Sequence, residues 1–441
     1  MQIRKTKIKD NKKVLIQTPH EESLLNSEKL YFPVTSGRCP VGAPCVEEGD
    51  HIKVGQLIGV REGAFFDQQI RSSVSGKVVK SEKKVDQTGK LVNCIVIEND
   101  CKYEVYNPGF ERSDEEIEKL TQEEVVDIIR DSGLVGLGGA AFPSYIKLGT
   151  KEEIKVVVAN GAECEPFLIS DWKFMYENPS DVINGLKIVM RAVNAPEGVI
   201  AVKKKNKHLI AKLEEELLNH SDANIRVAKI KDFYPAGWEI QTVKLATGIT
   251  VPQGTILAES GVLNFNTTTL GSLYQAVKYG RPLIERYFTI SGDGIKNTTF
   301  RVRLGTPVRE LIEKAGGYLD PEIPKTLVLG GPMMGVNTTN DDIVITDTTT
   351  SLLVFNRPID IVEDPCILCA SCIDVCPVDI DPVLIMKAQR ARDKDELLKL
   401  DVNKCIECGL CSYICPSKIP LTEEIRKAKR TVSRWEHATR C

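Results

Sequence analysis

Two cysteine runs near the C-terminal end of the chain share the spacing C-x2-C-x2-C-x3-C-P. Short gaps let three thiolates of a run surround one face of an iron–sulfur cube, while the fourth cysteine reaches the cube of the other run. Clusters of this kind carry electrons one at a time. We therefore expect one [4Fe–4S] cluster on Cys366, Cys369, Cys372 and Cys415, and a second on Cys405, Cys408, Cys411 and Cys376.

A pair of zinc knuckles is the alternative for closely spaced thiols. Zinc sites normally use two separated cysteine pairs or histidine ligands, whereas each run has three evenly spaced thiols, no histidine and a final Cys-Pro. This is the spacing of bacterial ferredoxins. The sequence thus predicts a ferredoxin-like domain with two [4Fe–4S] clusters, which we place at residues 353–441.

Length and composition narrow the class of protein that carries these clusters. A chain of 441 residues should hold several domains. Its net charge of −3 gives no reason to expect nucleic acid as a partner. No run approaches 18 apolar residues, and the basic N-terminal segment has no apolar centre, so we expect neither a membrane span nor a secretory signal. Reduced clusters favour the cytoplasm, with peripheral docking at a membrane left open.

The N-terminal region, residues 1–112, shows short apolar runs separated by glycines. The pattern of residues 49–59 and 72–79 resembles a barrel-sandwich hybrid, the fold of biotinyl and lipoyl carrier domains. The equivalent of the carrier hairpin, residues 63–69, contains no lysine, so packing or docking is favoured over a swinging arm. Cys39 and Cys45 flank a turn; they are either two reduced surface-loop cysteines, or a redox-active pair or extra ligand.

Residues 113–283 alternate between helical and strand patterns, which predicts a Rossmann-like parallel α/β domain covered on both faces. The expected helices are 116–121, 123–130, 180–191 and 208–218, and the expected strands are 154–159, 198–202 and 225–231.

Residues 284–352 predict a small β-grasp module. Two strand patterns precede a helix at residues 305–316, with Thr306 as its N-cap and Pro307 as its first residue, and a further strand follows. We expect this module to act as a structural spacer.

A glycine loop follows the predicted helix 123–130. Gly136, Gly138 and Ala141 formally fit the dinucleotide pattern G-x-G-x-x-[GA], but that fingerprint must follow a strand and open a helix. Consecutive glycines still let backbone N–H groups approach an anion closely. An anion-cradling loop and a plain turn both remain open.

The loop residues 136–147, the segment 160–166 and Asp171 together resemble the RnfC family, whose members are components of electron-transport complexes. They are more distantly similar to the flavin-bearing, NADH-oxidising subunit of respiratory complex I. The order of the four predicted modules along the chain matches the RnfC family as well. RnfC-like electron-transfer proteins associated with proline reductase share the same architecture.

The resemblance implies FMN on the glycine loop with NADH stacked over it. Hydride leaves NADH as two electrons, whereas a [4Fe–4S] cluster accepts one, so a flavin is needed between them. Glu163 and Glu165 would shape the nicotinamide pocket as catalytic residues; otherwise they are ordinary loop acids. The cofactor contacts implied are Gly136, Gly138, Gly139, Ala140, Phe142, Lys147, Asn160, Gly237, Glu239, Asn264 and Asn266, the last four lying in two further loops of the pocket.

Three functions follow from these observations. The leading hypothesis is a flavo-iron–sulfur protein that passes electrons between NAD(H) and a ferredoxin or membrane Rnf-type partner. A second is a soluble electron donor to a cytoplasmic reductase such as proline reductase. A third, of a different class, is a non-catalytic iron–sulfur scaffold with an empty glycine loop.

Overall fold

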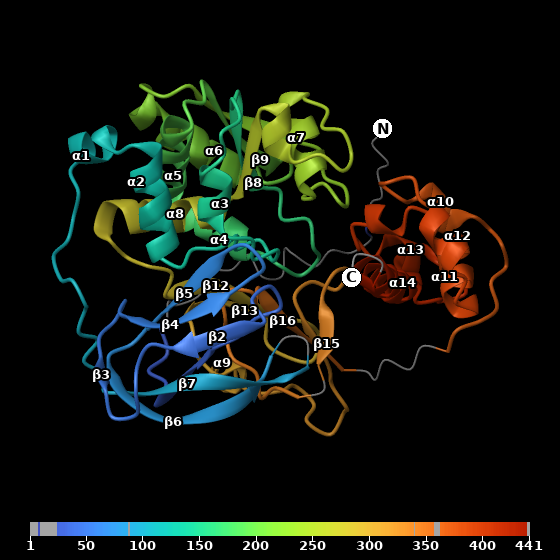
Figure 1. Ribbon diagram of the computed structural model, residues 1–441, viewed down its shortest axis with the longest axis horizontal. Coiled ribbons are helices and arrows are strands. Elements are labelled where there is room, and N and C mark those ends of the chain that lie inside the picture. The colour runs from blue at the N-terminus through green and yellow to red at the C-terminus, as the bar shows by residue number, and fades with distance from the viewer. Residues whose placement is uncertain (1–7, 9–23, 87–88, 339, 357–361, 439–441) are drawn as a thin grey trace.

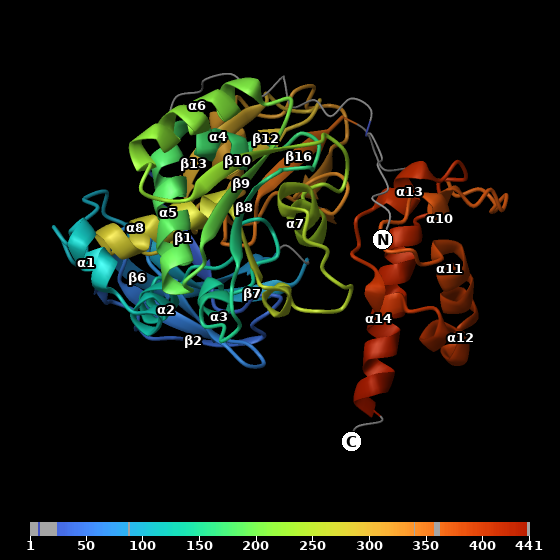
Figure 2. The same ribbon diagram turned by 90° about the horizontal axis from the view of Figure 1, so that it is seen from above.

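The computed structural model describes residues 8, 24–86, 89–338, 340–356 and 362–438 (Figure 1). Three modules pack into a larger body, and the C-terminal helices form a smaller body beside it (Figures 1 and 2). The multidomain α/β and α+β class predicted from the sequence is confirmed. The basic N-terminal segment, on which the expected absence of a secretory signal depended, lies almost wholly outside the described residues. None of the described helices combines the length and apolar character needed to cross a membrane.

The N-terminal module is built from two small sheets. One has the strand order β1-β7-β6-β3 and the other β2-β4-β5, with all pairs antiparallel. Alternating side chains such as Leu30, Ile58 and Ile97 form the apolar core between the sheets. The strands are β1 (Lys29–Pro33), β2 (Val41–Pro44), β3 (His51–Ile52), β4 (Leu57–Glu62), β5 (Asp67–Arg71), β6 (Gly76–Val85) and β7 (Leu91–Asn99).

Two expectations for this module meet their outcome here. The hairpin between β4 and β5 contacts the next module, because Asp67 accepts hydrogen bonds from Arg130 and from the Tyr145 hydroxyl. The expectation of two surface-loop cysteines is wrong for Cys39, which is only 1% exposed, whereas Cys45 is exposed. Burial raises the pKa of the Cys39 thiol.

The central domain contains the predicted parallel sheet, in the order β10-β9-β8-β11. Its elements are α1 (Asp114–Lys119), α2 (Gln122–Asp131), α3 (Ser144–Leu148), β8 (Val156–Gly161), α4 (Ser170–Glu177), α5 (Pro179–Ala192), β9 (Glu197–Lys203), α6 (Lys207–Leu217), β10 (Ile225–Ile230), α7 (Glu239–Thr247), β11 (Val262–Asn266) and α8 (Thr267–Tyr279).

The sheet is buried on both faces, as its continuous apolar strands require. Val157 and Ala159 of β8 face a core shared with α2, α5 and α8. Val156 and Val158 face a second core shared with α7. The strand β11 was missed in the sequence, because its apolar run is short and interrupted by Asn264. The expected loop containing Asn264 and Asn266 is therefore the end of a buried strand.

The third module is a five-stranded sheet, β13-β12-β16-β14-β15, with helix α9 packed on it. The strand β16 pairs in parallel with β12, so the predicted boundary between residues 352 and 353 falls inside a strand of this sheet. The elements are β12 (Glu285–Ser291), β13 (Thr298–Arg303), α9 (Val308–Lys314), β14 (Thr326–Leu329), β15 (Val336–Thr338) and β16 (Ser351–Phe355).

The predicted N-cap of α9 is wrong. The helix begins at Val308 with Pro307 in the N-cap position. The hydroxyl of Thr306 is buried and makes no hydrogen bond within the described chain. The following proline reserves the first helical turn for residues after it, so the threonine lies one residue too early to cap.

The smaller body holds both cysteine runs. Each run leads into a short helix, and α14 packs its Ile425, Ala428 and Val432 side chains into the module's core. The side chain of Asp381 caps α11 by accepting from the Val383 and Leu384 amides. The helices are α10 (Ser371–Asp374), α11 (Pro382–Ala391), α12 (Lys394–Lys399), α13 (Leu410–Ile414) and α14 (Leu421–Ala438).

Candidate flavin and iron–sulfur sites

The eight cysteines of the two runs line two separate cavities, in the crossed grouping that the spacing predicts. Three thiols of each run share a cavity with the fourth thiol of the other. The first cavity is lined by Cys366, Cys369, Cys372 and Cys415. The second is lined by Cys376, Cys405, Cys408 and Cys411.

The donor set in each cavity suits a multi-iron cluster. Across the described residues, no three histidine, cysteine or acidic side chains converge as they would around a single metal ion, which argues against the zinc alternative. The amide of Glu407 already donates to the Cys405 sulfur at 3.3 Å, the type of N–H···S bond that stabilises cluster sulfurs. Burial raises the pKa of the Cys408 thiol to about 12, so this thiol would release a proton on binding iron.

The glycine loop lies at the carboxyl ends of β8 and β11, where ligands of parallel sheets bind. Its base is closed by two backbone bonds, from the Gly136 amide to the Phe142 carbonyl and from the Ala141 amide to the Gly136 carbonyl. Gly138, Gly139 and Ala140 at its tip are exposed. Their amides donate no hydrogen bond within the described residues, so they are available to an anionic ligand.

A carboxylate network supports the loop from below. Asp171 accepts from the Asn266 amide at 2.7 Å and from the Thr268 hydroxyl at 2.9 Å. Glu163 accepts from the Asp171 backbone N–H at 3.1 Å. Burial and the neighbouring charge of Glu163 raise the pKa of Asp171 to about 7. A Cβ on Gly138 would come within 3.3 Å of the Asn266 amide, so the glycine places the loop directly on this network.

Two cations face the loop from different modules. Lys147 donates to the Asn264 carbonyl at 3.0 Å, and burial lowers its pKa while the Glu239 carboxylate opposes that shift. Arg38 of the N-terminal module donates to the Ala140 carbonyl at 2.6 Å and lies over the Phe142 ring. Ala140 and Phe142 are thus used in a contact between modules. Sequence reasoning missed Arg38, because nothing local distinguishes it from other surface arginines.

Several polar atoms beside the loop have no partner in the described chain. They include the buried Asn264 Oδ1 and the buried Thr267 hydroxyl. Buried polar groups are normally hydrogen-bonded, so these atoms, with the free loop amides and the space above Gly138, fit a polar cofactor. The Asn160 amide donates to the Gly237 carbonyl at 3.0 Å and joins the second predicted segment to the pocket.

The two predicted catalytic acids face different neighbours. Glu163 belongs to the network under the loop. Glu165 instead accepts from the Met333 amide at 3.0 Å and lies 3.4 Å from the Tyr234 hydroxyl. That hydroxyl donates to the carbonyl of the cluster-site residue Cys408 at 2.8 Å. The structure therefore brings Glu165 to the contact with the cluster module, which the sequence did not indicate.

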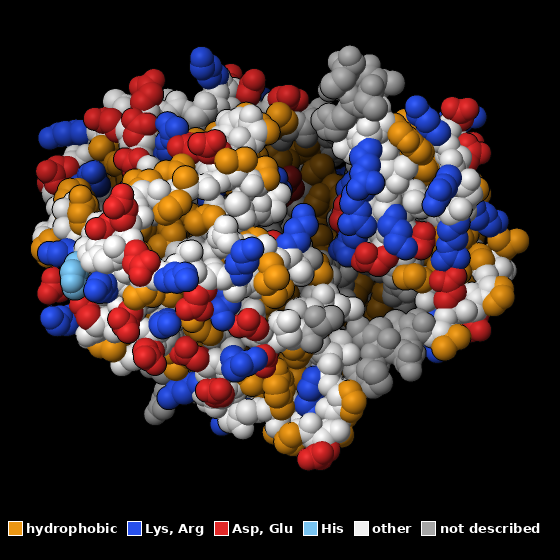
Figure 3. All heavy atoms as spheres, turned by 60° about the horizontal axis from the view of Figure 1, so that its bottom comes forward, with side chains coloured by type: hydrophobic (Ala, Val, Ile, Leu, Met, Phe, Trp, Pro, Cys, Tyr) orange, Lys and Arg blue, Asp and Glu red, His pale blue; other side chains and the backbone are white. Residues whose placement is uncertain are grey.

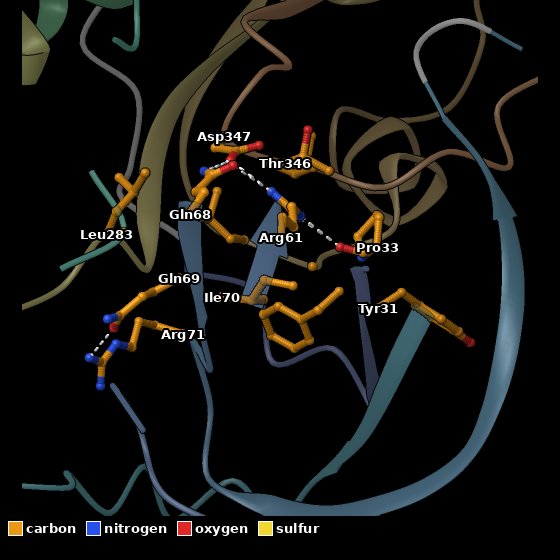
Figure 4. A pocket seen from close by; sticks show the side chains of 15 residues that line it. Tyr31, Pro33, Arg61, Gln68, Gln69, Ile70, Arg71, Leu283, Thr346 and Asp347 are labelled. Carbon is orange, nitrogen blue, oxygen red and sulfur yellow. Dashed lines mark hydrogen bonds and ion pairs between the residues drawn. The ribbon is translucent and has the colours of Figure 1, made fainter. Parts of the chain in front are cut away.

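A buried polar junction fixes the glycine loop to the two β modules (Figure 4). Arg61 pairs with Asp347 at 2.9 Å, and both side chains are only 6% exposed. Arg61 also donates twice to the Pro33 carbonyl. Arg286 donates to the Asp347 carbonyl and to the Leu137 carbonyl inside the glycine loop. Burial lowers the pKa of Arg286 to about 10.

Comparison with known proteins agrees with this geometry. Residues 6–102 match the RnfC barrel sandwich hybrid domain, 129–275 the Nuo51 FMN-binding domain, 287–337 the SLBB domain and 358–416 a 4Fe-4S dicluster domain. The chain is 35% identical over 400 residues to the RnfC component of the Na(+)-translocating ferredoxin:NAD(+) oxidoreductase complex of Acetobacterium woodii, covering 89% of each chain. The chain belongs to the RnfC family.

Further comparisons extend the family match. The RnfC component of the proton-translocating ferredoxin:NAD(+) oxidoreductase complex of Clostridium ljungdahlii is 34% identical over 381 residues, or 85% of this chain and 81% of that one. The NAD+-reducing [NiFe]-hydrogenase in the H2-reduced state has a TM-score of 0.49 at 15% identity, over 70% of this chain and 61% of that one. The expected cofactor classes, FMN and two [4Fe–4S] clusters, are confirmed by the domain matches. The chain is a flavo-iron–sulfur electron-transfer protein of the RnfC type.

Proposed function

We propose that this protein exchanges electrons between NAD(H), bound over FMN, and two [4Fe–4S] clusters that serve an external one-electron partner. The relatives named above belong to ferredoxin:NAD(+) oxidoreductase complexes. By analogy, the partner is a ferredoxin-linked component of a membrane Rnf-type complex, at which this chain docks peripherally. A soluble reductase as the partner is the alternative outcome of the tests below.

The chain's own residues divide into three groups in this proposal. The amides of Gly138, Gly139 and Ala140, with Lys147 and Asn266, hold FMN. FMN supplies the conversion between two-electron and one-electron transfer. Glu163 and Glu165 border the nicotinamide pocket, where a carboxylate is suited to hydrogen-bond ribose or amide groups. The four thiols of each cavity ligate one cluster.

One observation carries the proposal. A domain whose loop presents free amides and unpartnered buried oxygens packs, within one chain, against a module with two cavities of four thiols each. A scaffold needs neither the free polar groups nor their proximity to the thiols. The arrangement is that of a two-electron site feeding one-electron carriers.

The direct test follows the flavin of cluster-loaded protein after mixing with NADH in a stopped-flow instrument. Wild-type protein should show loss of oxidised flavin absorbance followed by cluster reduction. Glu163→Gln removes a charge-assisted hydrogen bond worth roughly 1.5–3 kcal/mol, so flavin reduction should slow by on the order of ten- to a hundred-fold. Reduction of the clusters by dithionite should be unchanged.

Glu153→Gln is the matched control, because Glu153 is an exposed loop acid near the amino end of β8, remote from the pocket. The scaffold function predicts no bound flavin and no NADH oxidation by any of these proteins. Equal rates in the Glu163→Gln and wild-type proteins would remove this acid from the nicotinamide pocket. Co-purification with membrane proteins of an Rnf-type complex, or with a soluble reductase, identifies the partner.

A further inference from the structure

The central domain touches the cluster module at the second cysteine run. Tyr234 is 2% exposed, and its hydroxyl donates to the Cys408 carbonyl. It packs there in one apolar cluster with Cys408 and Leu410. Glu165 sits on the other side of the phenol and also receives the Met333 amide. A single phenol therefore spans from a pocket acid to a proposed cluster ligand.

The internal repeat shows that this contact is specific to the second run. Gly409 has a left-handed conformation at φ +79°, and a Cβ on it would lie 2.4 Å from the Met333 carbonyl. The equivalent residue of the first run is Ala370, which adopts a similar conformation at φ +59°. An alanine is therefore compatible with the cysteine loop itself. Glycine at position 409 serves the close approach of the central body.

The first run faces the opposite way. Its Leu368 is 69% exposed, and Cys369 is exposed. At the equivalent positions of the second run, Glu407 is half-buried and pairs with Arg426 and Lys429, and Cys408 is buried. Helix α13 of the second run lies closer to α7 than does α10 of the first run (Figure 2). Figure 3 shows a hollow between the two bodies, so their contact covers a limited area.

We propose that Tyr234 and Gly409 are positioning residues that hold the second cluster, on Cys376, Cys405, Cys408 and Cys411, against the flavin pocket. This cluster then exchanges electrons with the flavin, and the first cluster exchanges them with the external partner. The inference rests on the proposed function. Each step moves one electron: the donor loses it, an oxidised [4Fe–4S] centre gains it, and no bond forms or breaks. Two such steps remove the electron pair of one hydride from NADH, whose proton is released to water.

The order of the clusters is tested by removing them one at a time. In Cys369→Ser protein, which lacks a ligand of the first cluster, NADH should still reduce the remaining cluster, as seen by its electron paramagnetic resonance signal. In Cys408→Ser protein, NADH should no longer reduce the first cluster, although dithionite should. The reverse pattern would overturn the proposed order.

The positioning role is tested by Gly409→Ala and Tyr234→Phe, with Ala370→Gly and Tyr413→Phe as matched controls. Tyr413 is an exposed tyrosine of the same module. All four proteins should keep both clusters. Loss of the Tyr234 hydrogen bond should lower the docked population and slow flavin-to-cluster transfer by about fivefold, and Gly409→Ala should slow it more. The controls should match the wild type.

A second readout needs neither flavin nor NADH. In cluster-loaded, flavin-free protein, amide hydrogen exchange of residues 405–411 should be faster in Tyr234→Phe and Gly409→Ala proteins than in wild type, while residues 366–372 should be unaffected. Unchanged exchange in both variants would refute the positioning role. If exchange changes as expected but NADH reduces no flavin in the wild type, the docking stands and the proposed function fails.

Discussion

Replacing Asp347 by alanine should destabilise the junction between the two β modules and the glycine loop. The change leaves the Arg61 guanidinium buried beside the Pro33 carbonyl without its counter-charge. At a separation of 2.9 Å and an effective dielectric constant of about 20, the lost attraction is about 6 kcal/mol. Partial relaxation and water entry reduce this, and breaking a buried pair typically costs roughly 3–5 kcal/mol.

The assay is thermal unfolding of the flavin-loaded protein, followed by near-ultraviolet circular dichroism and by release of flavin. For a unit of 150–250 residues, a loss of roughly 3–5 kcal/mol lowers Tm by about 6–20 °C. Flavin release should move with this transition, because Arg286 connects the Asp347 carbonyl to the Leu137 carbonyl of the loop. A multidomain chain need not unfold in one step, so the two signals are compared separately.

The double variant Arg61→Met with Asp347→Leu is the informative partner of this experiment. It removes both charges together, and such exchanges are often close to neutral, so most of the lost Tm should return. Glu104→Ala is the control, since its pair with Lys53 is 3.7 Å long and both side chains are about half exposed; it should cost less than about 1 kcal/mol. A Tm drop for Asp347→Ala no larger than that of this control would refute the reasoning.

Three further predictions concern the cofactor sites. Cys415→Ser should lower the iron content from about eight to about four per chain and remove the cluster of the first run, as checked by iron analysis and spectroscopy, whereas Cys101→Ser at an exposed thiol should change neither. Gly138→Val should displace the Asn266 amide from Asp171 and weaken FMN binding by on the order of ten- to a hundred-fold in equilibrium titration, while Gly37→Val, which points into open space, should not. Because the pKa of Asp171 is raised from 3.8 to about 7, the folded chain binds more protons than the unfolded chain between these values, so wild-type stability should fall as pH rises from about 4 to 7. Asp171→Asn protein should lack this decline in thermal unfolding at a series of pH values; a parallel decline in both proteins would contradict the assignment.

The parts of the structure that depend on neighbouring residues could be predicted from the sequence. The cysteine runs are local, so their spacing alone indicated the two crossed thiol sets that the cavities show. The strands of the parallel sheet were visible as apolar runs, apart from β11, where Asn264 interrupts the pattern. The helix start after Pro307 was misplaced, because the proline and threonine signals overlap there.

The contacts between modules could not be predicted. Arg61 and Asp347 are 286 residues apart, and neither stands in a motif. The same holds for Arg38 at the glycine loop and for Tyr234 at Cys408. Each of these side chains gains its role from the placement of a whole module, which a single sequence does not specify. The division between Glu163 and Glu165 was hidden for the same reason, although the two acids are almost adjacent in the chain.

The distance in sequence between Arg61 and Asp347 has a consequence for biosynthesis. A ribosome adds about 5–20 residues per second, so the 286 residues that separate the pair take roughly 15–60 s to follow Arg61. During that time the guanidinium has no counter-charge and stays hydrated, because burying it alone is costly. The N-terminal module and the glycine loop therefore cannot be locked together until nearly the whole β-grasp sheet has emerged. Newly made chains should accordingly acquire flavin late in synthesis, and truncated nascent chains that end before residue 347 should not retain it.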